Sequence, residues 1–224
     1  REQAGGLARA RQLQGKELSY NNINDANAAL EMVRSFREPA VAAVKHTNPC
    51  GLAIGSTIAE AFGRARDADP VSIFGGIVAC NRPVDGQAAR LMADLFLEVI
   101  LAPSFDAEAL EILRPKKNLR LLEVPDVGLQ ETYWDVRGVR GGLLIQEADV
   151  LPSPVRKGRV VTEKAPTEQQ WEDLEFAWKV VRHVKSNGIV VAAGGQTLGI
   201  GAGQMNRILP TRLALQQAGE RARG

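Results

Sequence analysis

Short apolar runs alternate with amphipathic segments through the first half of the chain. Residues 39–45 (PAVAAVK) predict a buried strand that ends before the turn-forming pair Asn48-Pro49. Thr57 and Glu60 have the spacing of a helix-capping pair, which predicts a helix through Arg66. The same alternation continues with strands at 71–80, 98–103 and 119–124 and helices at 85–96 and 106–113. This pattern predicts an α/β fold in which helices cover a mostly parallel or mixed sheet.

The second half of the chain begins with a proline-containing, charged stretch at 150–166, which is typical of a connector between two units. We therefore expect a first unit at 1–150, a connector at 151–166 and a second unit beginning at 167–224. Within the second unit, a helix capped by Thr167 and Gln170 is expected, with an apolar face marked by Trp171, Leu174, Trp178, Val181 and Val184 or Lys185. Strands at 188–193 and 196–203 predict a hairpin around Gly194-Gly195, and a last helix is expected from Thr211 to about Ala222.

Composition narrows the functional classes. The 28 Lys and Arg residues nearly balance 26 Asp and Glu residues and are interspersed with them, so charge favours no nucleic-acid partner. No stretch has the length and apolarity of a membrane span or the features of a signal peptide. Only two cysteines are present, which is typical of a reducing compartment, and we expect a cytoplasmic protein. Because the first residue is not Met, we expect the chain to begin inside a longer gene product.

The most informative polar residues are Lys45 and His46, at the end of the first predicted strand. The ends of strands are where α/β sheets usually bind ligands. On an extended backbone the two side chains would point to opposite faces, so we expect a bend from Asn48-Pro49 and Gly51 to bring them to one site. An imidazole there could transfer a proton while the ammonium stabilises developing negative charge. The alternative is a solvated strand edge.

Several further residues lie where elements end. Asn187 follows the predicted helix, where it could serve a site or simply cap the helix. The glycine-rich run at 199–203 resembles a dinucleotide fingerprint, but Gln204 replaces its third glycine and no helix follows at once, so we reject NAD. We expect these glycines to allow close approach of a ligand or another subunit, with Arg207 binding a phosphate or carboxylate; an exposed Arg beside a glycine-rich hairpin is the alternative.

The remaining candidates carry weaker signals. Gly75, inside an apolar run, suggests a bulge or the close approach of another group. Cys50 lacks the second cysteine of a zinc deaminase motif and is expected to be a packing residue. His183 is expected on the helix surface and not as a ligand.

Four segments together resemble one known family. They are KHTNPCG (45–51), SIFGG (72–76), FAWKVVRHVKSNGIVVA (176–192) and QTLGIGAGQMNR (196–207). They resemble the transformylase part of the bifunctional purine-synthesis enzyme, which is usually fused to inosine monophosphate (IMP) cyclohydrolase, and the likeness runs over essentially the whole chain. The resemblance implies transfer of a formyl group from 10-formyltetrahydrofolate to the exocyclic amine of aminoimidazole carboxamide ribonucleotide (AICAR).

The resemblance also implies roles for individual residues. His46 would transfer the proton with Lys45 as its partner, and Asn187 would orient the reacting groups. Nucleotide contacts would come from Asn187 together with Gly75, Glu98 and Arg207, and Ile208 would lie near the folate. The implied fold is a pair of related, cytidine-deaminase-like α/β units with mixed sheets and flanking helices, of which the second is incomplete here. The implied assembly is an intertwined homodimer with shared sites and no zinc; a structural potassium ion is left open.

The chain departs from the full family pattern at its ends. A phosphate-binding segment is expected before residue 1, the residues that complete the folate side are expected after Gly224, and no cyclohydrolase domain is present. We therefore expect an enzymatic parent and an inactive isolated fragment. One alternative is a non-catalytic nucleotide-binding or dimerisation module of the same fold, which would not need His46. Another is a zinc deaminase relative.

Overall fold

The computed structural model describes residues 6–127, 132–150 and 153–223. Its main feature is an eight-stranded sheet with the order β1-β6-β5-β4-β2-β3-β10-β9. These strands are β1 (Arg11–Gln14), β2 (Ala40–Lys45), β3 (Asn48–Ile54), β4 (Ile77–Cys80), β5 (Val99–Ala102), β6 (Arg120–Glu123), β9 (Ile189–Ala193) and β10 (Gln196–Gly201). The β4-β5 and β5-β6 pairs are parallel, whereas the remaining pairs are antiparallel. The predicted α/β fold with a mixed sheet is confirmed.

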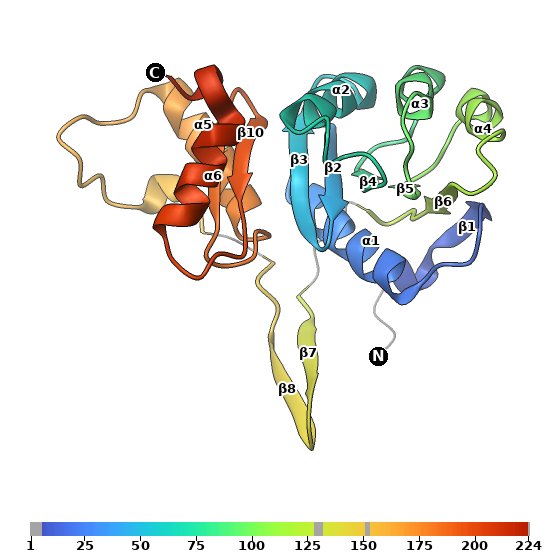
Figure 1. Cartoon of the computed structure of the whole chain (residues 1–224), viewed down its shortest axis with the longest axis horizontal. Coiled ribbons are helices and arrows are strands. Elements are labelled where there is room, and N and C mark those ends of the chain that lie inside the picture. The colour runs from blue at the N-terminus through green and yellow to red at the C-terminus, as the bar shows by residue number, and fades with distance from the viewer. Residues whose placement is uncertain (1–5, 128–131, 151–152, 224) are drawn as a thin grey trace.

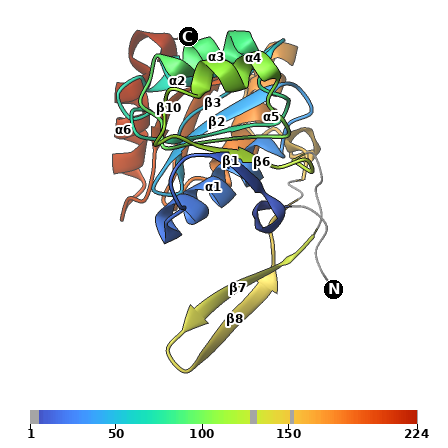
Figure 2. The ribbon, with the colours of Figure 1, turned by 90° about the vertical axis from the view of Figure 1, so that its right-hand side faces the viewer.

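Helices cover both faces of this sheet. They are α1 (Tyr20–Val33), α2 (Ile58–Ala68), α3 (Gly86–Ala93), α4 (Ala107–Leu113), α5 (Glu168–Val181) and α6 (Ile208–Ala218), with single 3-10 turns at Leu7–Arg9, Val155–Lys157 and Gly219–Ala222. Helices α2, α3 and α4 lie on one face and α1 on the other (Figures 1 and 2). Helix α6 packs on β10, and α5 packs on β9.

The central strand β2 is buried on both faces, as the apolar run at 39–45 predicted. Val41 and Ala43 belong to the core under α2, α3 and α4, while Ala42 and Val44 belong to the core under α1 and α5. This alternation follows from the two-residue period of a strand. The buried strand is therefore a rigid support for its last residue, Lys45, which lies at an edge of the molecule.

Side-chain caps explain where most helices begin. Ser19, Thr57, Asp85, Asp106 and Thr167 each accept a hydrogen bond from the backbone amide three residues later. Such caps satisfy amides that have no partner inside the helix. The predicted cap residues Thr57 and Thr167 are confirmed.

Three predicted elements differ in the structure. Only Ile77–Cys80 of the expected strand 71–80 is a strand, because the Asp69 carboxylate accepts the amides of Val71 and Ser72 and holds that part in turns. The last helix begins at Ile208, since the side-chain oxygen of Asn206 accepts the amides of Ile208 and Leu209.

The buried face of α5 is the third difference. Phe176 and Val180 are buried, whereas Leu174 and Trp178, which were expected inside, are 42% and 49% exposed. Phe176 packs against Phe36, with ring centroids 5.3 Å apart. Val184 of the predicted face is buried and Trp171 and Val181 are half-buried, so the helical period was correct and the prediction was wrong for Leu174 and Trp178.

The sheet takes strands from both sides of the 151–166 connector, since Gln196 of β10 pairs with Ala53 of β3. The division into two units stays a prediction. Among the described residues, no helix is long and apolar enough to cross a membrane.

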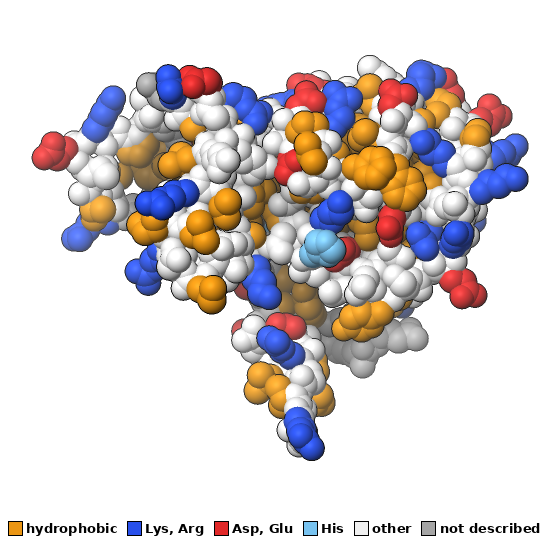
Figure 3. Space-filling view, viewed as in Figure 1, with side chains coloured by type: hydrophobic (Ala, Val, Ile, Leu, Met, Phe, Trp, Pro, Cys, Tyr) orange, Lys and Arg blue, Asp and Glu red, His pale blue; other side chains and the backbone are white. Residues whose placement is uncertain are grey.

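A separate hairpin, β7 (Trp134–Val139) and β8 (Gly142–Glu147), projects from the body (Figures 1 and 2). Figure 3 shows apolar side chains gathered along it. Residues that lie opposite one another share a face, so the register places Trp134, Val136, Leu143 and Ile145 on one side. All four side chains are more than half exposed. The hairpin therefore carries an apolar face that nothing in the described chain covers.

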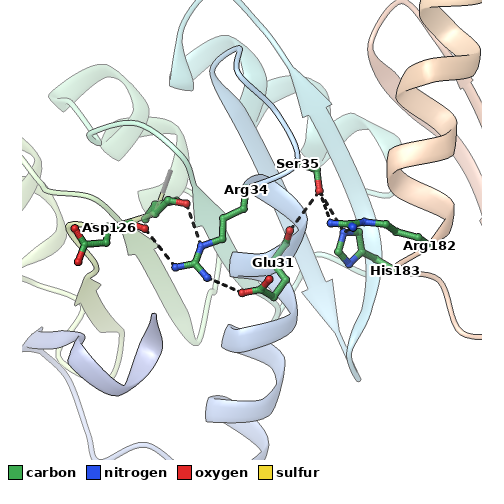
Figure 4. A network of polar contacts seen from close by, with 7 residues as sticks. Glu31, Arg34, Ser35, Asp126, Arg182 and His183 are labelled. Atoms are coloured by element: carbon green, nitrogen blue, oxygen red, sulfur yellow. Dashed lines mark hydrogen bonds and ion pairs between the residues drawn. The ribbon is translucent and has the colours of Figure 1, made fainter. Parts of the chain in front are cut away.

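Two arginines bind the backbone at the two ends of this hairpin. Arg34 donates to the carbonyl oxygens of Val127 at 3.1 Å and Asp126 at 3.3 Å, before β7, and pairs with Glu31 (Figure 4). Arg182 donates to the carbonyl oxygen of Asp149, after β8, at 2.6 Å. Because both guanidinium groups are carried by helices that pack on the sheet, the hairpin leaves the body in a defined direction.

Candidate active site

The site begins at the turn between β2 and β3. His46 and Thr47 form a two-residue loop between the paired residues Lys45 and Asn48, and their φ angles are 53° and 64°. The bend expected at Asn48-Pro49 and Gly51 is therefore wrong. Pro49 and Gly51 lie inside β3, and Pro49 sits opposite Val44, next to an irregularity in the register.

Helix α1 holds this turn in place. The Asp25 carboxylate accepts the amide of His46 at 3.1 Å through one oxygen and that of Thr47 at 2.7 Å through the other. The His46 carbonyl oxygen accepts from the Thr47 hydroxyl at 2.6 Å and from the Asn48 side-chain amide at 3.0 Å. The backbone of the turn is thus fixed by side chains, while the His46 side chain is exposed.

Lys45 points toward the turn that precedes β4. Its ammonium donates to the carbonyl oxygen of Phe74 at 2.7 Å. The next residue, Gly75, has φ 72° and donates its amide to Phe96 at 2.7 Å. The structure therefore brings Lys45 and Gly75 together, and His46 follows Lys45 directly.

Glu98 lies beside the same turn, because its amide donates to the carbonyl oxygen of Gly76 at 3.0 Å. Its carboxylate accepts from the side-chain amide of Asn22 at 2.8 Å and lies 4.0 Å from the Arg120 guanidinium. The Glu98 side chain is still 41% exposed. A ligand hydroxyl could therefore reach this carboxylate.

Asn187 approaches the hairpin turn from the other half of the sheet. Its backbone amide and its side-chain amide both donate to Gln204, at 3.1 and 3.0 Å, and the Ser186–Asn187 peptide is cis. Two residues earlier, the amide of Lys185 donates to the side-chain oxygen of Asn48 at 2.9 Å. This bond connects the loop at 185–187 to the turn that carries His46 within one chain.

Arg207 and Ile208 stand farther along, at the start of α6. Both are exposed, and within the described part of the chain the Arg207 guanidinium makes no hydrogen bond or ion pair. The chain places them three and four residues after Gln204, which bonds to Asn187. The structure thus brings Lys45, His46, Gly75 and Glu98 together and connects the loop of Asn187 to them through Lys185 and Asn48. Among the described residues, Arg207 and Ile208 make no side-chain hydrogen bond or ion pair to that group.

Comparison with known proteins identifies the family. The model of the AICARFT/IMPCHase bienzyme family matches residues 1–217. This chain belongs to that family. Among its relatives, the bifunctional purine biosynthesis protein PurH of Anoxybacillus flavithermus is 58% identical over 218 residues, which are 97% of this chain and 43% of the relative. The PurH proteins of Thermoanaerobacter sp. and Shouchella clausii are 57% and 59% identical, over 99% and 97% of this chain and 43% and 42% of the relatives. The chain spans less than half the length of these relatives.

In this AICARFT/IMPCHase chain, the prediction for the glycine-rich run is wrong at Gly199 and Gly201 of β10, which lie against helix α6. A Cβ on Gly199 would lie 1.9 Å from the carbonyl oxygen of Ala214, and one on Gly201 would lie 2.0 Å from that of Pro210. Both glycines therefore allow α6 of the same chain to approach, and not a ligand or a second subunit. Through this contact they fix the start of α6, where Arg207 lies.

Two residues of the site were missed from the sequence, and a third was given another role. Asn22 and Asp25, which hold Glu98 and the His46 turn, were missed, whereas Asn48, which holds Lys185, was expected to form the bend. A signal was present for the first, because Asn22 lies four and seven residues before the buried Ala26 and Ala29. A polar residue on the apolar stripe of a helix is a candidate for a buried hydrogen bond.

The other titratable candidates stay outside the site. Burial, helped by the Asp69 charge, raises the pKa of Cys50 to about 12, so its thiol is protonated, as suits the predicted packing role. The described residues contain no group of three His, Cys, Asp or Glu side chains that could hold a metal. His183 was expected on the helix surface, but it is half-buried after α5 and accepts from Arg182 at 3.1 Å (Figure 4).

Proposed function

We propose that this chain carries the formyltransferase part of a bifunctional enzyme, and that it transfers the formyl group of 10-formyltetrahydrofolate to the amine of AICAR. The observation that carries the proposal is that Lys45, His46 and Gly75 lie around the end of strand β2, to which the loop of Asn187 is connected through the hydrogen bond between Lys185 and Asn48. Family membership supports the same reading. We assign IMP cyclohydrolase activity to the part of the parent protein outside these residues.

The proposed reaction forms one C–N bond and breaks another. The AICAR amine attacks the formyl carbon, and the carbonyl oxygen becomes an oxyanion. Collapse of this tetrahedral intermediate breaks the bond to N10 of the folate, which takes up a proton and leaves as tetrahydrofolate. Since the amine is conjugated with its ring and is a weak nucleophile, proton removal and charge stabilisation must accompany the attack.

The side chains of the site can supply both functions. Within the described residues, the His46 ring makes no hydrogen bond, so its nitrogens are available to take the amine proton. The Lys45 ammonium has three protons and donates one of them to Phe74, which leaves two for the oxyanion. Asn187 would orient the reacting groups, Gly75 and Glu98 would contact the nucleotide, Arg207 would bind its phosphate, and Ile208 would lie against the folate.

The test is His46→Ala in the full-length gene product that contains this chain. Formyl transfer should fall about 10²- to 10⁴-fold, the usual contribution of a positioned proton-transfer group. AICAR affinity, measured by calorimetry, should change little. The chain has only one other histidine, so His183→Asn is the matched control and should stay near wild-type activity. Undiminished transfer by His46→Ala would contradict the role of His46, whereas AICAR binding without formyl transfer, unaffected by His46→Ala, would favour a non-catalytic nucleotide-binding module.

We further propose that the active form is a homodimer and that the β7-β8 hairpin contacts the second copy. A two-stranded hairpin is marginally stable in water by itself, yet this one is held at both roots and presents an apolar face. Leu143 belongs to that face, whereas its neighbour Leu144 points to the opposite side. Leu143→Asp should shift sedimentation of the full-length protein toward monomer, and Leu144→Asp should shift it much less. Equal behaviour of the two variants would argue against this contact.

A further inference from the structure

The turn that carries His46 has a backbone conformation that its sequence disfavours. Both His46 and Thr47 have positive φ angles, and neither is glycine. Two-residue hairpin loops of this kind prefer Asn-Gly or Gly-Gly, because a side chain is strained at positive φ, and a β-branched residue such as Thr especially so. Something outside the turn must therefore stabilise it.

Asp25 is the residue that does so. Its two carboxylate oxygens each accept one backbone amide, those of His46 and Thr47, so both residues of the strained loop are bound by one side chain. Hydrogen bonds to an ionised acceptor are stronger than neutral ones. Asp25 itself is fixed, because the next residue, Ala26, and Ala29 are fully buried in the core beneath α1.

Asp25 lies on a helix, α1, that contacts both the turn with His46 and the residue Glu98. Asn22, three residues earlier and so on the same side of the helix, donates to Glu98. One face of α1 thereby sets the spacing between the turn with His46 and the strand end with Glu98. A rigid helix is a suitable element for this purpose, since small misplacements of reacting groups are costly.

We propose that Asp25 is a positioning residue: by binding the amides of His46 and Thr47 it holds the strained turn and so aims the His46 imidazole at the substrate. This inference rests on the proposed function of His46. Asp25 acts on the backbone of the turn and not on the reacting atoms. Its loss should therefore slow the chemical step more than it weakens nucleotide binding.

The structure offers a specific rescue experiment. Without the carboxylate, Thr47 should leave its positive φ angle, and a glycine at that position should restore the turn because glycine adopts such angles freely. Thr47→Ala removes the same hydroxyl but keeps a Cβ, so it is the matched control for Thr47→Gly. Asp25→Ala/Thr47→Gly and Asp25→Ala/Thr47→Ala thus differ only in whether the turn is relieved.

The expected results concern kcat and AICAR affinity of the full-length protein. Asp25→Ala should lower kcat by roughly 10- to 100-fold, the scale of a misplaced catalytic group, with nearly unchanged AICAR dissociation. Adding Thr47→Gly to Asp25→Ala should recover most of this loss in kcat, whereas adding Thr47→Ala should not. Glu111→Ala, which removes an exposed carboxylate from α4, is the charge control and should keep full activity.

Two outcomes would overturn the inference: undiminished kcat in Asp25→Ala, or equal activity of the two double variants. Should Asp25→Ala fail to fold, Asp25→Asn keeps the shape but turns one acceptor into a donor that faces an amide, and the same rescue comparison applies to it. Failure of the proposed function can be distinguished, because a wild-type protein without formyl transfer, or a His46→Ala variant that retains it, would contradict that function whatever the Asp25 variants do.

Discussion

Gly199→Ala tests how α6, and with it Arg207, is placed on the sheet. The added methyl group would lie 1.9 Å from the carbonyl oxygen of Ala214 and 2.9 Å from its carbonyl carbon. Both atoms are backbone atoms of a helix, so neither can rotate away. Pro210, one turn before Ala214 in α6, makes the equivalent contact with Gly201. Helix α6 therefore lies flat along β10.

The size of the effect follows from this distance. Real Cβ atoms essentially never come within 3.0 Å of such an atom, so α6 must move by at least the 1.1 Å that separates 3.0 from 1.9 Å. Such a movement would loosen the packing of Ala214 and Ala218, which are buried against the sheet. Overpacking typically costs about 1–3 kcal/mol, and we expect the upper part of that range because the obstacle is backbone.

Urea unfolding of the full-length protein, followed by circular dichroism, measures this loss. Gly63→Ala is the matched control, since Gly63 lies in α2 and a Cβ there meets nothing within 4 Å. That variant should be more stable than wild type by about 0.5–1 kcal/mol, the usual gain from alanine in a helix. A Gly199→Ala variant as stable as wild type would refute the close packing of α6 on β10.

Three further predictions concern stability and thiol chemistry. Asn81→Ala should lower the free energy of unfolding in urea by at least about 2 kcal/mol. The buried Ala40 amide donates to the Asn81 side-chain oxygen at 2.7 Å, and the variant leaves this amide without an acceptor. Burial, with the Arg182 charge, lowers the pKa of His183 from 6.5 to about 3. Between about pH 6.5 and 3 the unfolded chain therefore binds a proton that the folded chain does not. The free energy of unfolding should fall as the pH is lowered through this range, by up to about 2 kcal/mol at pH 5. His183→Asn should remove this part of the pH dependence. Burial also raises the pKa of Cys50 and of Cys80, so a thiol reagent at pH 8 should modify both only after unfolding.

Local signals predicted the elements whose ends are set by neighbouring residues. Thr167 and Gln170 form a reciprocal cap at α5, and the hairpin around Gly194-Gly195 occurs where its glycines indicated. Strand β2 was found because its apolar run is buried on both faces. The cap and the hairpin depend on residues that are close together in the sequence. Strand β2 is buried on both faces, so the sequence did not have to indicate which face is buried.

The sequence failed where distant contacts decide. Val71 and Phe74 have strand-like side chains but are 81% and 59% exposed in turns. Strand β3 was missed because Pro49 and Gly51 are typical of turns. A Cβ on Gly51 would lie 2.0 Å from the carbonyl oxygen of Ala65, so glycine is there to let α2 approach. That reason is visible only once α2 is packed on the sheet.

The site itself combines both situations. Lys45 and His46 could be found because polar, titratable residues follow a buried strand, and their position at its end is a local property. The bend was placed two residues too late because local preference favours Asn48-Pro49 over His46-Thr47 as a turn. The fold overrides that preference through the two hydrogen bonds that the amides of His46 and Thr47 donate to Asp25, twenty-one residues before His46. A turn made of unfavourable residues and held by a distant carboxylate is a conflict between local preference and fold, and such conflicts are expected where function constrains the residues. The same conflict therefore supports the proposed catalytic role of His46, since a turn serving only the fold would be better made with glycine.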